Sequence, residues 1–283
     1  RNRATTIDSM IPPLIVVGHA IARAIRAGCP GVPVVVGGAH PTALAERTLR
    51  EFPCFDAAVQ GEGEGAFLEV CQRFAAGRDL SGVAGIARRE GDGVVREPER
   101  KRMTPEEYEA LPLPARDMLD MDKYPGASKS GLPAEVYRTT QLFTSRGCPF
   151  PCTFCAIFLT TSRTVRFRSP ASVRKELAEC VSRYRIEHVS VHDDTYTVSA
   201  RRVREISPAL GEAGVTWDCD TRVDTVTEEM LREMAKNGCI RIAFGVESGS
   251  ERMLKAMKKN LTREQIRNAF AWAREAGIMT SAY

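Results

Sequence analysis

Three thiols lie close together in one short segment of the chain. Cys148, Cys152 and Cys155 have the spacing Cys-x3-Cys-x2-Cys. Thiolates at this spacing can each bind one iron of a four-iron cluster, whereas an ordinary ferredoxin closes every corner with cysteine. The fourth iron would then have no protein ligand and would be open to another molecule. The segment therefore predicts a site for chemistry, with these three cysteines as the metal ligands.

A structural zinc site is an alternative for the same thiols. Zinc needs a fourth ligand at comparable spacing, and the nearest downstream candidates, Cys180, His188 and His192, do not form a paired set. Free cysteines also serve as small core residues, but a glycine and two prolines favour an open loop here. The other cysteines have no motif spacing and are expected in the core: Cys29, Cys54, Cys71, Cys180, Cys219 and Cys239.

The segment Thr144–Cys155 strongly resembles the cluster motif of the radical S-adenosylmethionine (SAM) enzymes. The resemblance implies that the open iron chelates the amino and carboxylate groups of SAM. It also implies that the cluster supplies one electron and that SAM cleaves to a 5'-deoxyadenosyl radical. Phe154 matches the aromatic position of the motif, where the backbone meets the adenine.

Two further stretches extend this resemblance to SAM binding. Asp193 and Asp194 follow a predicted strand, where relatives place the groups that hold the amino group of SAM, although two acidic residues also favour a helix N-terminus. Glu247 and Ser248 resemble the segment that binds the ribose hydroxyls and the methionine end of SAM. Arg222 is expected to pair either with the carboxylate of SAM or with a neighbouring aspartate.

The amino-terminal part looks like the cobalamin-binding domain of one large radical SAM branch. The resemblance lies in Gly37, Gly38 and His40, followed by Gly61 and Glu62. It implies that these residues line the pocket for the nucleotide tail of cobalamin. The Asp-x-His-x-x-Gly signature is absent, so we expect no histidine below the cobalt. A Rossmann-like domain that binds nothing is the alternative, because glycine turns alone are weak evidence.

The pattern of strands and helices predicts an α/β protein with two sheets. Val32–Val36 and Phe55–Val59 read as strands that open into the glycine turns, and Thr42 is expected to cap a helix over Ala43–Glu51. This is a Rossmann-like, doubly wound layout. Further along, strands alternate with helices as in a partial parallel (β/α) barrel. The expected strands are Leu142–Ser145, His188–His192, Val215–Cys219, Ile240–Val246 and one beginning at Ile278.

We therefore expect three regions along the chain. Residues 1–76 form the cobalamin-binding domain, 77–136 a hairpin and a proline-rich linker, and 137–283 the radical SAM partial barrel. The chain starts at Arg1 and stops as a strand begins, so we expect both domains to be truncated at the outer ends.

Composition narrows the class of protein. The chain has 283 residues, 43% hydrophobic content and a net charge of +4, which fits a globular protein without the basic stripe of a nucleic-acid partner. No apolar run is long enough to span a membrane. The odd number of cysteines, without a disulfide framework, predicts a reducing cytoplasm.

The predicted function is that of a cobalamin-dependent radical SAM enzyme. Its cofactors are a [4Fe-4S] cluster, SAM and cobalamin, and its partners are a small-molecule substrate and an electron donor such as flavodoxin or ferredoxin. Methylation of an unactivated carbon is the leading expectation, and cyclisation and rearrangement are the alternative reactions. One alternative is a radical SAM enzyme without cobalamin, such as a methylthiotransferase with a second cluster on Cys29, Cys54 and Cys71. Another is a non-enzymatic iron-sulfur or zinc-binding module.

Overall fold

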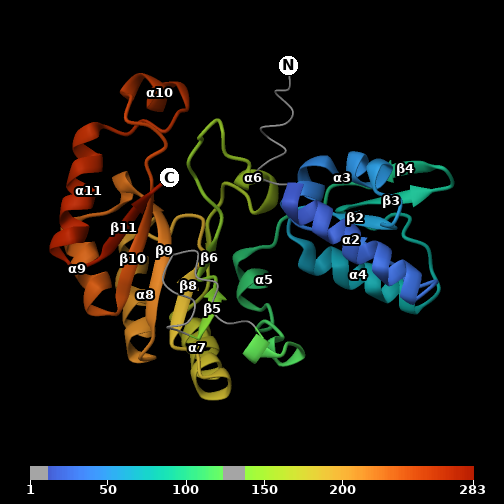
Figure 1. Cartoon of the computed structure of the whole chain (residues 1–283), viewed down its shortest axis with the longest axis horizontal. Coiled ribbons are helices and arrows are strands. Elements are labelled where there is room, and N and C mark those ends of the chain that lie inside the picture. Colours follow the sequence, from blue (N-terminus) through green and yellow to red (C-terminus); the bar gives the residue numbers. More distant parts are fainter. Residues whose placement is uncertain (1–11, 124–137) are drawn as a thin grey trace. The chain divides into compact units, whose positions relative to one another are not determined.

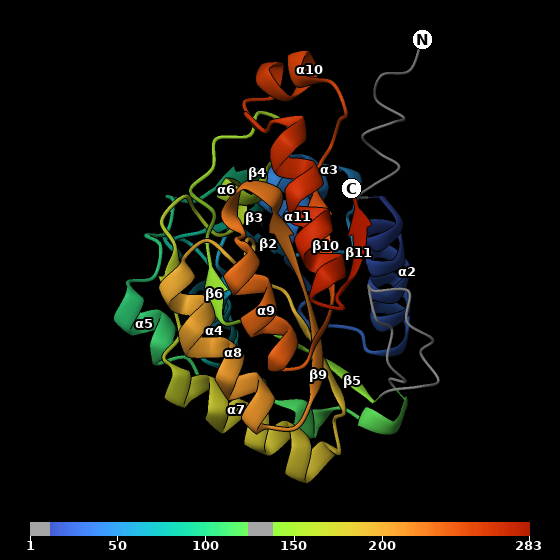
Figure 2. The same cartoon turned by 90° about the vertical axis from the view of Figure 1, so that its left-hand side faces the viewer.

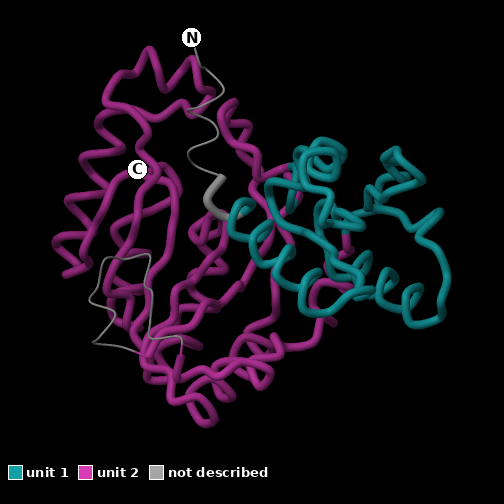
Figure 3. The backbone as a smooth tube through the Cα atoms, turned by 45° about the vertical axis from the view of Figure 1, so that its right-hand side comes forward, with its two compact units in different colours: residues 1–102, 159–161 teal, residues 103–158, 162–283 magenta. Residues whose placement is uncertain are grey.

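A computed structural model describes residues 12–123 and 138–283. Figure 1 gives the order of the elements along the chain. The chain divides into two compact units: the first ends at Arg102 and includes Leu159–Thr161, and the second comprises Met103–Phe158 and Ser162–Tyr283 (Figure 3). This division falls inside the predicted linker, while the predicted boundary between 136 and 137 lies outside the described residues.

The first unit contains a four-stranded sheet of order β1-β2-β3-β4. Strand β1 (Val35–Val36) lies parallel to β2 (Ala57–Val59), and β3 (Ile86–Glu90) pairs antiparallel with both β2 and β4 (Gly93–Arg96). The two parallel strands are shorter than expected but lie within the predicted runs. The predicted hairpin is confirmed, and it extends the same sheet.

Three helices pack beside this sheet: α2 (Pro12–Gly28), α3 (Ala39–Glu51) and α4 (Gly63–Ala75). Helix α3 begins directly after Gly38, so the predicted start at Thr42 is wrong. The Thr42 hydroxyl instead accepts the Gly61 N–H at 3.0 Å. This side chain ties the first turn of α3 to the Gly61 turn instead of capping the helix.

The second unit contains a five-stranded sheet of order β11-β10-β9-β8-β5 in which all strands are parallel. This confirms the predicted series of strands. The strands are β5 (Thr139–Leu142), β8 (His188–Val191), β9 (Thr216–Arg222), β10 (Cys239–Gly245) and β11 (Met279–Ala282).

Helices cover one face of this sheet. These helices lie side by side (Figure 2), and consecutive helices of the row contact one another. They are α7 (Pro170–Tyr184), α8 (Ala200–Glu212), α9 (Glu228–Lys236) and α11 (Arg263–Glu275). Each begins after a serine or threonine whose side chain accepts a backbone N–H of the first turn, an interaction that typically stabilises a helix by about 1 kcal/mol.

Large apolar side chains fill the space between the helices and the sheet. Trp217 and Phe244 from the strands and Leu177, Leu210 and Leu231 from the helices are almost completely buried. Burying one such side chain contributes roughly 1.5–3 kcal/mol. This core fixes the register of the strands, so the ends of β5, β8, β9 and β10 meet at one edge of the sheet.

The strand predicted over Leu142–Ser145 lies three residues earlier, at Thr139–Leu142, so the predicted bounds are wrong. β5 ends at Leu142, and Ser145–Arg146 (β6) instead pairs antiparallel with Arg166–Phe167 (β7). Short helical elements complete the chain: α5 (Pro105–Glu109), η1 (Arg116–Met118), η2 (Met121–Lys123), α6 (Ile157–Thr160), η3 (Val223–Thr225) and α10 (Glu251–Ala256).

Candidate cluster and cofactor sites

The three predicted cluster ligands lie on the loop that follows β6. Cys148 and Cys152 are buried, and Cys155 is half-buried. Burial raises the pKa of the Cys155 thiol, the Ile157 amide lowers it, and negative charge on Cys148 and Cys152 raises it further. The three sulfurs are therefore close enough to influence one another.

Backbone hydrogen bonds give the cluster loop its shape. Gly147 has φ +109°, and a Cβ on this residue would come within 2.3 Å of the Thr164 carbonyl oxygen, so only glycine fits. Its N–H donates to Asp194 Oδ2 at 2.7 Å. Farther along, the N–H of Thr153 donates to the Met257 carbonyl at 3.0 Å. The loop is thus held at its start and at its middle.

Asp193 anchors the chain just before this loop. Its two carboxylate oxygens accept the N–H and hydroxyl groups of both Thr144 and Ser145, over distances of 2.5–2.9 Å. The side chain is almost completely buried. Burial raises the pKa of Asp193, while these hydrogen bonds lower it. Because four donors already occupy the carboxylate, Asp193 positions the loop, and its contact with the ammonium of SAM stays a prediction.

Arg222 forms the structural ion pair that the sequence left open. Its Nε and Nη2 donate to the two oxygens of Asp224, both at 2.8 Å. Nη2 also donates to the Lys259 carbonyl, and the guanidinium lies 3.9 Å from the centre of the Phe150 ring. Nη1 lies 3.3 Å from Cys152 Sγ, so this buried arginine contacts a predicted cluster ligand.

Glu247 and Ser248 follow the end of β10. Glu247 has φ +65°, an uncommon backbone conformation for a non-glycine residue. Its Oε1 accepts a hydrogen bond from Lys259 Nζ at 2.8 Å, and the same ammonium lies 5.6 Å from the centre of the Phe154 ring. Ser248 Oγ accepts the N–H of Ser250. Two predicted SAM residues, Glu247 and Phe154, therefore share one lysine neighbour.

No pattern in the sequence indicated Lys259 as a site residue. Its side chain is only 5% exposed, which is unusual for lysine unless the charge is paired. It stands in a turn where Lys258 and Asn260 both have positive φ. No motif spacing links this turn to Phe154 or Glu247, and only the folded chain brings the three together.

The chemistry of the donor set fits an iron-sulfur cluster. Three thiols from one loop supply the soft ligands that such clusters use, and the guanidinium of Arg222 provides positive charge beside them. Among residues 12–123 and 138–283, no group of three or more His, Cys, Asp or Glu side chains is arranged to hold a single metal ion. This holds for Cys29, Cys54 and Cys71 as well. Cys29 and Cys71 are exposed, so the expectation that they lie in the core is wrong, whereas Cys180, Cys219 and Cys239 are buried as expected.

The two glycine turns of the first unit lie at the same edge of its sheet. Gly37 and Gly38 follow β1, Gly61 and Glu62 follow β2, and these strands are parallel neighbours. Gly38 and Gly61 both have positive φ. A Cβ on Gly37 or Gly38 would meet no atom closer than 3.9 Å. The turn after β1 is thus open toward solvent, and half-buried His40 follows it in the first turn of α3.

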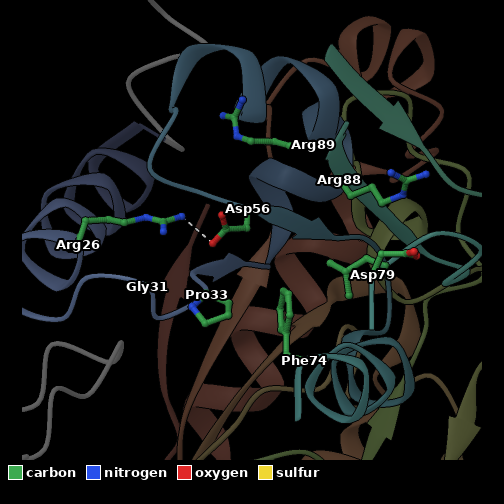
Figure 4. Close-up of a pocket in the computed structure, with 9 residues that line it drawn as sticks. Arg26, Gly31, Pro33, Asp56, Phe74, Asp79, Arg88 and Arg89 are labelled. Atoms are coloured by element: carbon green, nitrogen blue, oxygen red, sulfur yellow. Dashed lines mark ion pairs between the residues drawn. The ribbon is translucent and has the colours of Figure 1, made fainter. Parts of the chain in front are cut away.

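A cavity of about 280 Å³ lies at the opposite edge of this sheet (Figure 4). Pro33 and Asp56, which precede β1 and β2, line it, and Asp56 forms a 2.6 Å ion pair with Arg26. Arg88 and Arg89 also line it, but they donate to glutamates and to backbone carbonyls respectively. The charged groups Arg26, Asp56, Arg88 and Arg89 therefore stabilise the first unit through bonds to other protein groups.

Comparison with known proteins assigns both units. Residues 142–282 match the Radical SAM superfamily, and residues 9–71 match the B12 binding domain. The chain belongs to the radical SAM enzymes that carry a cobalamin-binding domain. This family uses a [4Fe-4S] cluster, SAM and cobalamin. In the part of the chain that is described, no helix is long and apolar enough to cross a membrane.

Two curated relatives are methyltransferases by name. The chain is 36% identical over 247 residues to an uncharacterized methyltransferase of Pyrococcus horikoshii, covering 87% of this chain and 52% of the relative. It is 32% identical over 272 residues to the cytidylyl-2-hydroxyethylphosphonate methyltransferase of Streptomyces wedmorensis, covering 88% and 51%. The chain thus spans about half the length of these relatives.

A solved structure confirms the fold. The cobalamin-dependent SAM radical enzyme OxsB, with aqua-cobalamin and SAM bound, superposes with a TM-score of 0.75 at 23% identity. The match covers 96% of this chain and 39% of OxsB. It bears out the prediction of a Rossmann-like domain followed by a parallel radical SAM sheet.

The anchor formed by Asp193 is testable by Asp193→Asn. The amide keeps the shape of the side chain but replaces one acceptor oxygen by a donor, so buried donors of Thr144 or Ser145 lose their partner. An unsatisfied buried group costs about 1–3 kcal/mol, and urea unfolding should show a loss of this size. Asp120→Asn, which removes an exposed pair with Lys123, is the control and should change stability by less than about 1 kcal/mol. Equal midpoints of urea unfolding for both variants would contradict the assignment of Asp193 as the anchor of the loop.

Proposed function

We propose that the full-length protein is a cobalamin-dependent radical SAM methyltransferase that acts on a small-molecule substrate. The observation that carries the proposal is the incomplete donor set of Cys148, Cys152 and Cys155 on the loop after β6. Phe154 of this loop lies 5.6 Å from the ammonium of Lys259, which pairs with Glu247. The B12 binding domain supports the use of cobalamin. The names of both relatives support methyl transfer, and cyclisation stays the second candidate because other relatives of 24–30% identity are named as cyclases.

In this proposal, the three cysteines hold a cluster that delivers one electron to bound SAM. Asp193 and Asp194 keep the loop in place through Thr144, Ser145 and Gly147. Asp194 also lies near the thiols, since its charge raises the pKa of Cys155. We assign Asp194, rather than Asp193, to the side of the site that receives the ammonium of SAM.

The remaining wall of the SAM site would consist of Phe154, Glu247, Ser248 and Lys259. A carboxylate can accept hydrogen bonds from both ribose hydroxyls, and Lys259 fixes the orientation of Glu247 through a 2.8 Å hydrogen bond. Half-exposed Phe154 offers its ring as an apolar surface. Arg222 has four of its N–H groups engaged by protein atoms, so we place it behind the thiols and not against the carboxylate of SAM.

Cobalamin would bind at the carboxyl edge of the first sheet. Gly37 and Gly38 leave open space for a close approach of the nucleotide tail, with Glu62 and His40 at the rim, whereas the Arg102 guanidinium already lies against Gly61. Thr42 links the first turn of α3 to the Gly61 turn, because its hydroxyl accepts the Gly61 N–H and its carbonyl accepts the side-chain amide of Gln60. The electron for the cluster would come from a flavodoxin or ferredoxin in a reducing cytoplasm, where such thiols persist.

Cluster ligation is tested by Cys152→Ala in anaerobically purified full-length protein. Removing one thiolate should lower the iron content and abolish the formation of deoxyadenosine from SAM. Cys180→Ala is the matched control, because Cys180 is a buried thiol of the helical core and should keep both. Retained iron and retained SAM cleavage in Cys152→Ala would refute the proposal.

The SAM wall is tested by Glu247→Gln. Loss of a charge-assisted hydrogen bond costs about 1.5–3 kcal/mol, so the Kd for SAM should rise roughly tenfold or more while the iron content is unchanged. Glu251→Gln, an exposed glutamate at the start of α10, should leave the Kd unchanged. Calorimetric titration of cluster-loaded protein measures both. An unchanged Kd in Glu247→Gln would leave Glu247 as a partner of Lys259 alone.

The cobalamin edge is tested by Gly37→Leu, because Gly37 lacks the positive φ that would strain any side chain. The leucine should fill the open turn and reduce the amount of cobalamin that the full-length protein retains after desalting. Gly28→Leu, at the exposed end of α2, should not.

A second experiment tests the coordination of cobalt. His40→Ala should leave the paramagnetic resonance spectrum of the cob(II)alamin form unchanged, without nitrogen superhyperfine splitting in either protein. Splitting that disappears in His40→Ala would identify His40 as an axial ligand and overturn the assignment to the rim.

A further inference from the structure

Arg222 approaches a predicted cluster ligand with a charged donor. Its Nη1 lies 3.3 Å from Cys152 Sγ, within the range of a hydrogen bond to sulfur, and both side chains are buried. The contact joins residues that are 70 positions apart in the sequence. It is therefore a product of the fold and not of the local geometry of the loop.

The other two thiols have neutral neighbours of a different kind. Cys148 Sγ lies 3.5 Å from Thr195 Oγ1, but the single hydroxyl proton of Thr195 is directed to the Asp194 carbonyl at 2.7 Å. Cys155 receives the backbone N–H of Ile157. In the described residues, Cys152 is therefore the cysteine of these three that receives a hydrogen bond from a cation.

The guanidinium has little freedom to leave this position. Asp224 holds Nε and Nη2 in a two-pronged ion pair, and the Lys259 carbonyl accepts a further hydrogen bond from Nη2. The ring of Phe150 covers its face at 3.9 Å. Such a planar fork with fixed partners is a rigid donor, and the remaining Nη1 group is thereby aimed at the sulfur.

We propose that Arg222 is a positioning residue that raises the reduction potential of the cluster through its hydrogen bond to Cys152. This inference rests on the proposed function only in requiring the cluster. A reduced cluster carries one more negative charge than an oxidised cluster. Positive charge and hydrogen bonds at the sulfurs therefore stabilise the reduced form. Asp224 partly offsets this effect, because its carboxylate neutralises the guanidinium from the other side.

The proposal predicts shifts of opposite sign for the two partners. Arg222→Gln removes the cation and should move the midpoint potential to a more negative value. Asp224→Asn keeps an oxygen that can accept from Nε but removes the negative charge, so the midpoint should become less negative. Arg222→Lys retains the charge without the fork and should fall between the unsubstituted protein and Arg222→Gln.

The measurement is a potentiometric titration of anaerobic full-length protein, monitored by paramagnetic resonance without SAM or cobalamin. Arg174→Gln is the matched control, because it removes the same charge from an exposed ion pair between α7 and α8 and should leave the midpoint unchanged. Iron content is determined for each sample. Because SAM and cobalamin are absent, the result does not depend on methyl transfer. If the unsubstituted protein contained no cluster, the proposed function itself would be refuted.

Unchanged midpoints in Arg222→Gln with full iron content would overturn the inference. Shifts of the same sign in Arg222→Gln and Asp224→Asn would also overturn it, since a general loosening of the loop gives that result. If the Arg222 variants lose their iron, the Asp224→Asn midpoint decides: a less negative value supports the role of Arg222, and an unchanged value refutes it.

Discussion

The carboxylate of Asp193 is the interaction on which the cluster loop depends. It accepts four hydrogen bonds from Thr144 and Ser145, at the point where β5 ends and the loop toward the cysteines begins. Asp193 itself follows β8, the neighbour of β5 in the sheet. One buried side chain therefore joins the ends of β5 and β8, and these hydrogen bonds set the directions of β6 and of the cysteine loop.

Buried charges organise the opposite side of the same loop. Arg222 and Lys259 are both nearly inaccessible, and each is paired with a carboxylate, Asp224 and Glu247 respectively. Removing one partner of such a pair leaves an uncompensated buried charge, which is costly. The pairs therefore specify one arrangement of β9, β10 and the turn at Lys259. A rigid rim of this kind suits a site that must hold a cluster and SAM in a fixed relation.

Sequence patterns predicted what depends on local spacing. Short local patterns of residue type and hydrophobic period predict the thiol motif, the five parallel strands and the hairpin. The role of Asp193 was not predictable, because its donors lie almost fifty residues earlier in the chain. The same holds for Lys259, whose burial depends on Glu247 and Phe154, and for Thr42, which contacts Gly61 instead of capping α3. Long-range pairing of polar groups is the property that the sequence pattern does not reveal.

The optical spectrum of anaerobically purified full-length protein, with and without added hydroxocobalamin, tests the central claim most directly. The account predicts broad iron-sulfur absorbance that dithionite bleaches, together with cobalamin bands that persist after desalting. A colourless protein that contains zinc would contradict the cluster, and a cluster-containing protein that retains no cobalamin would contradict the role of the first unit.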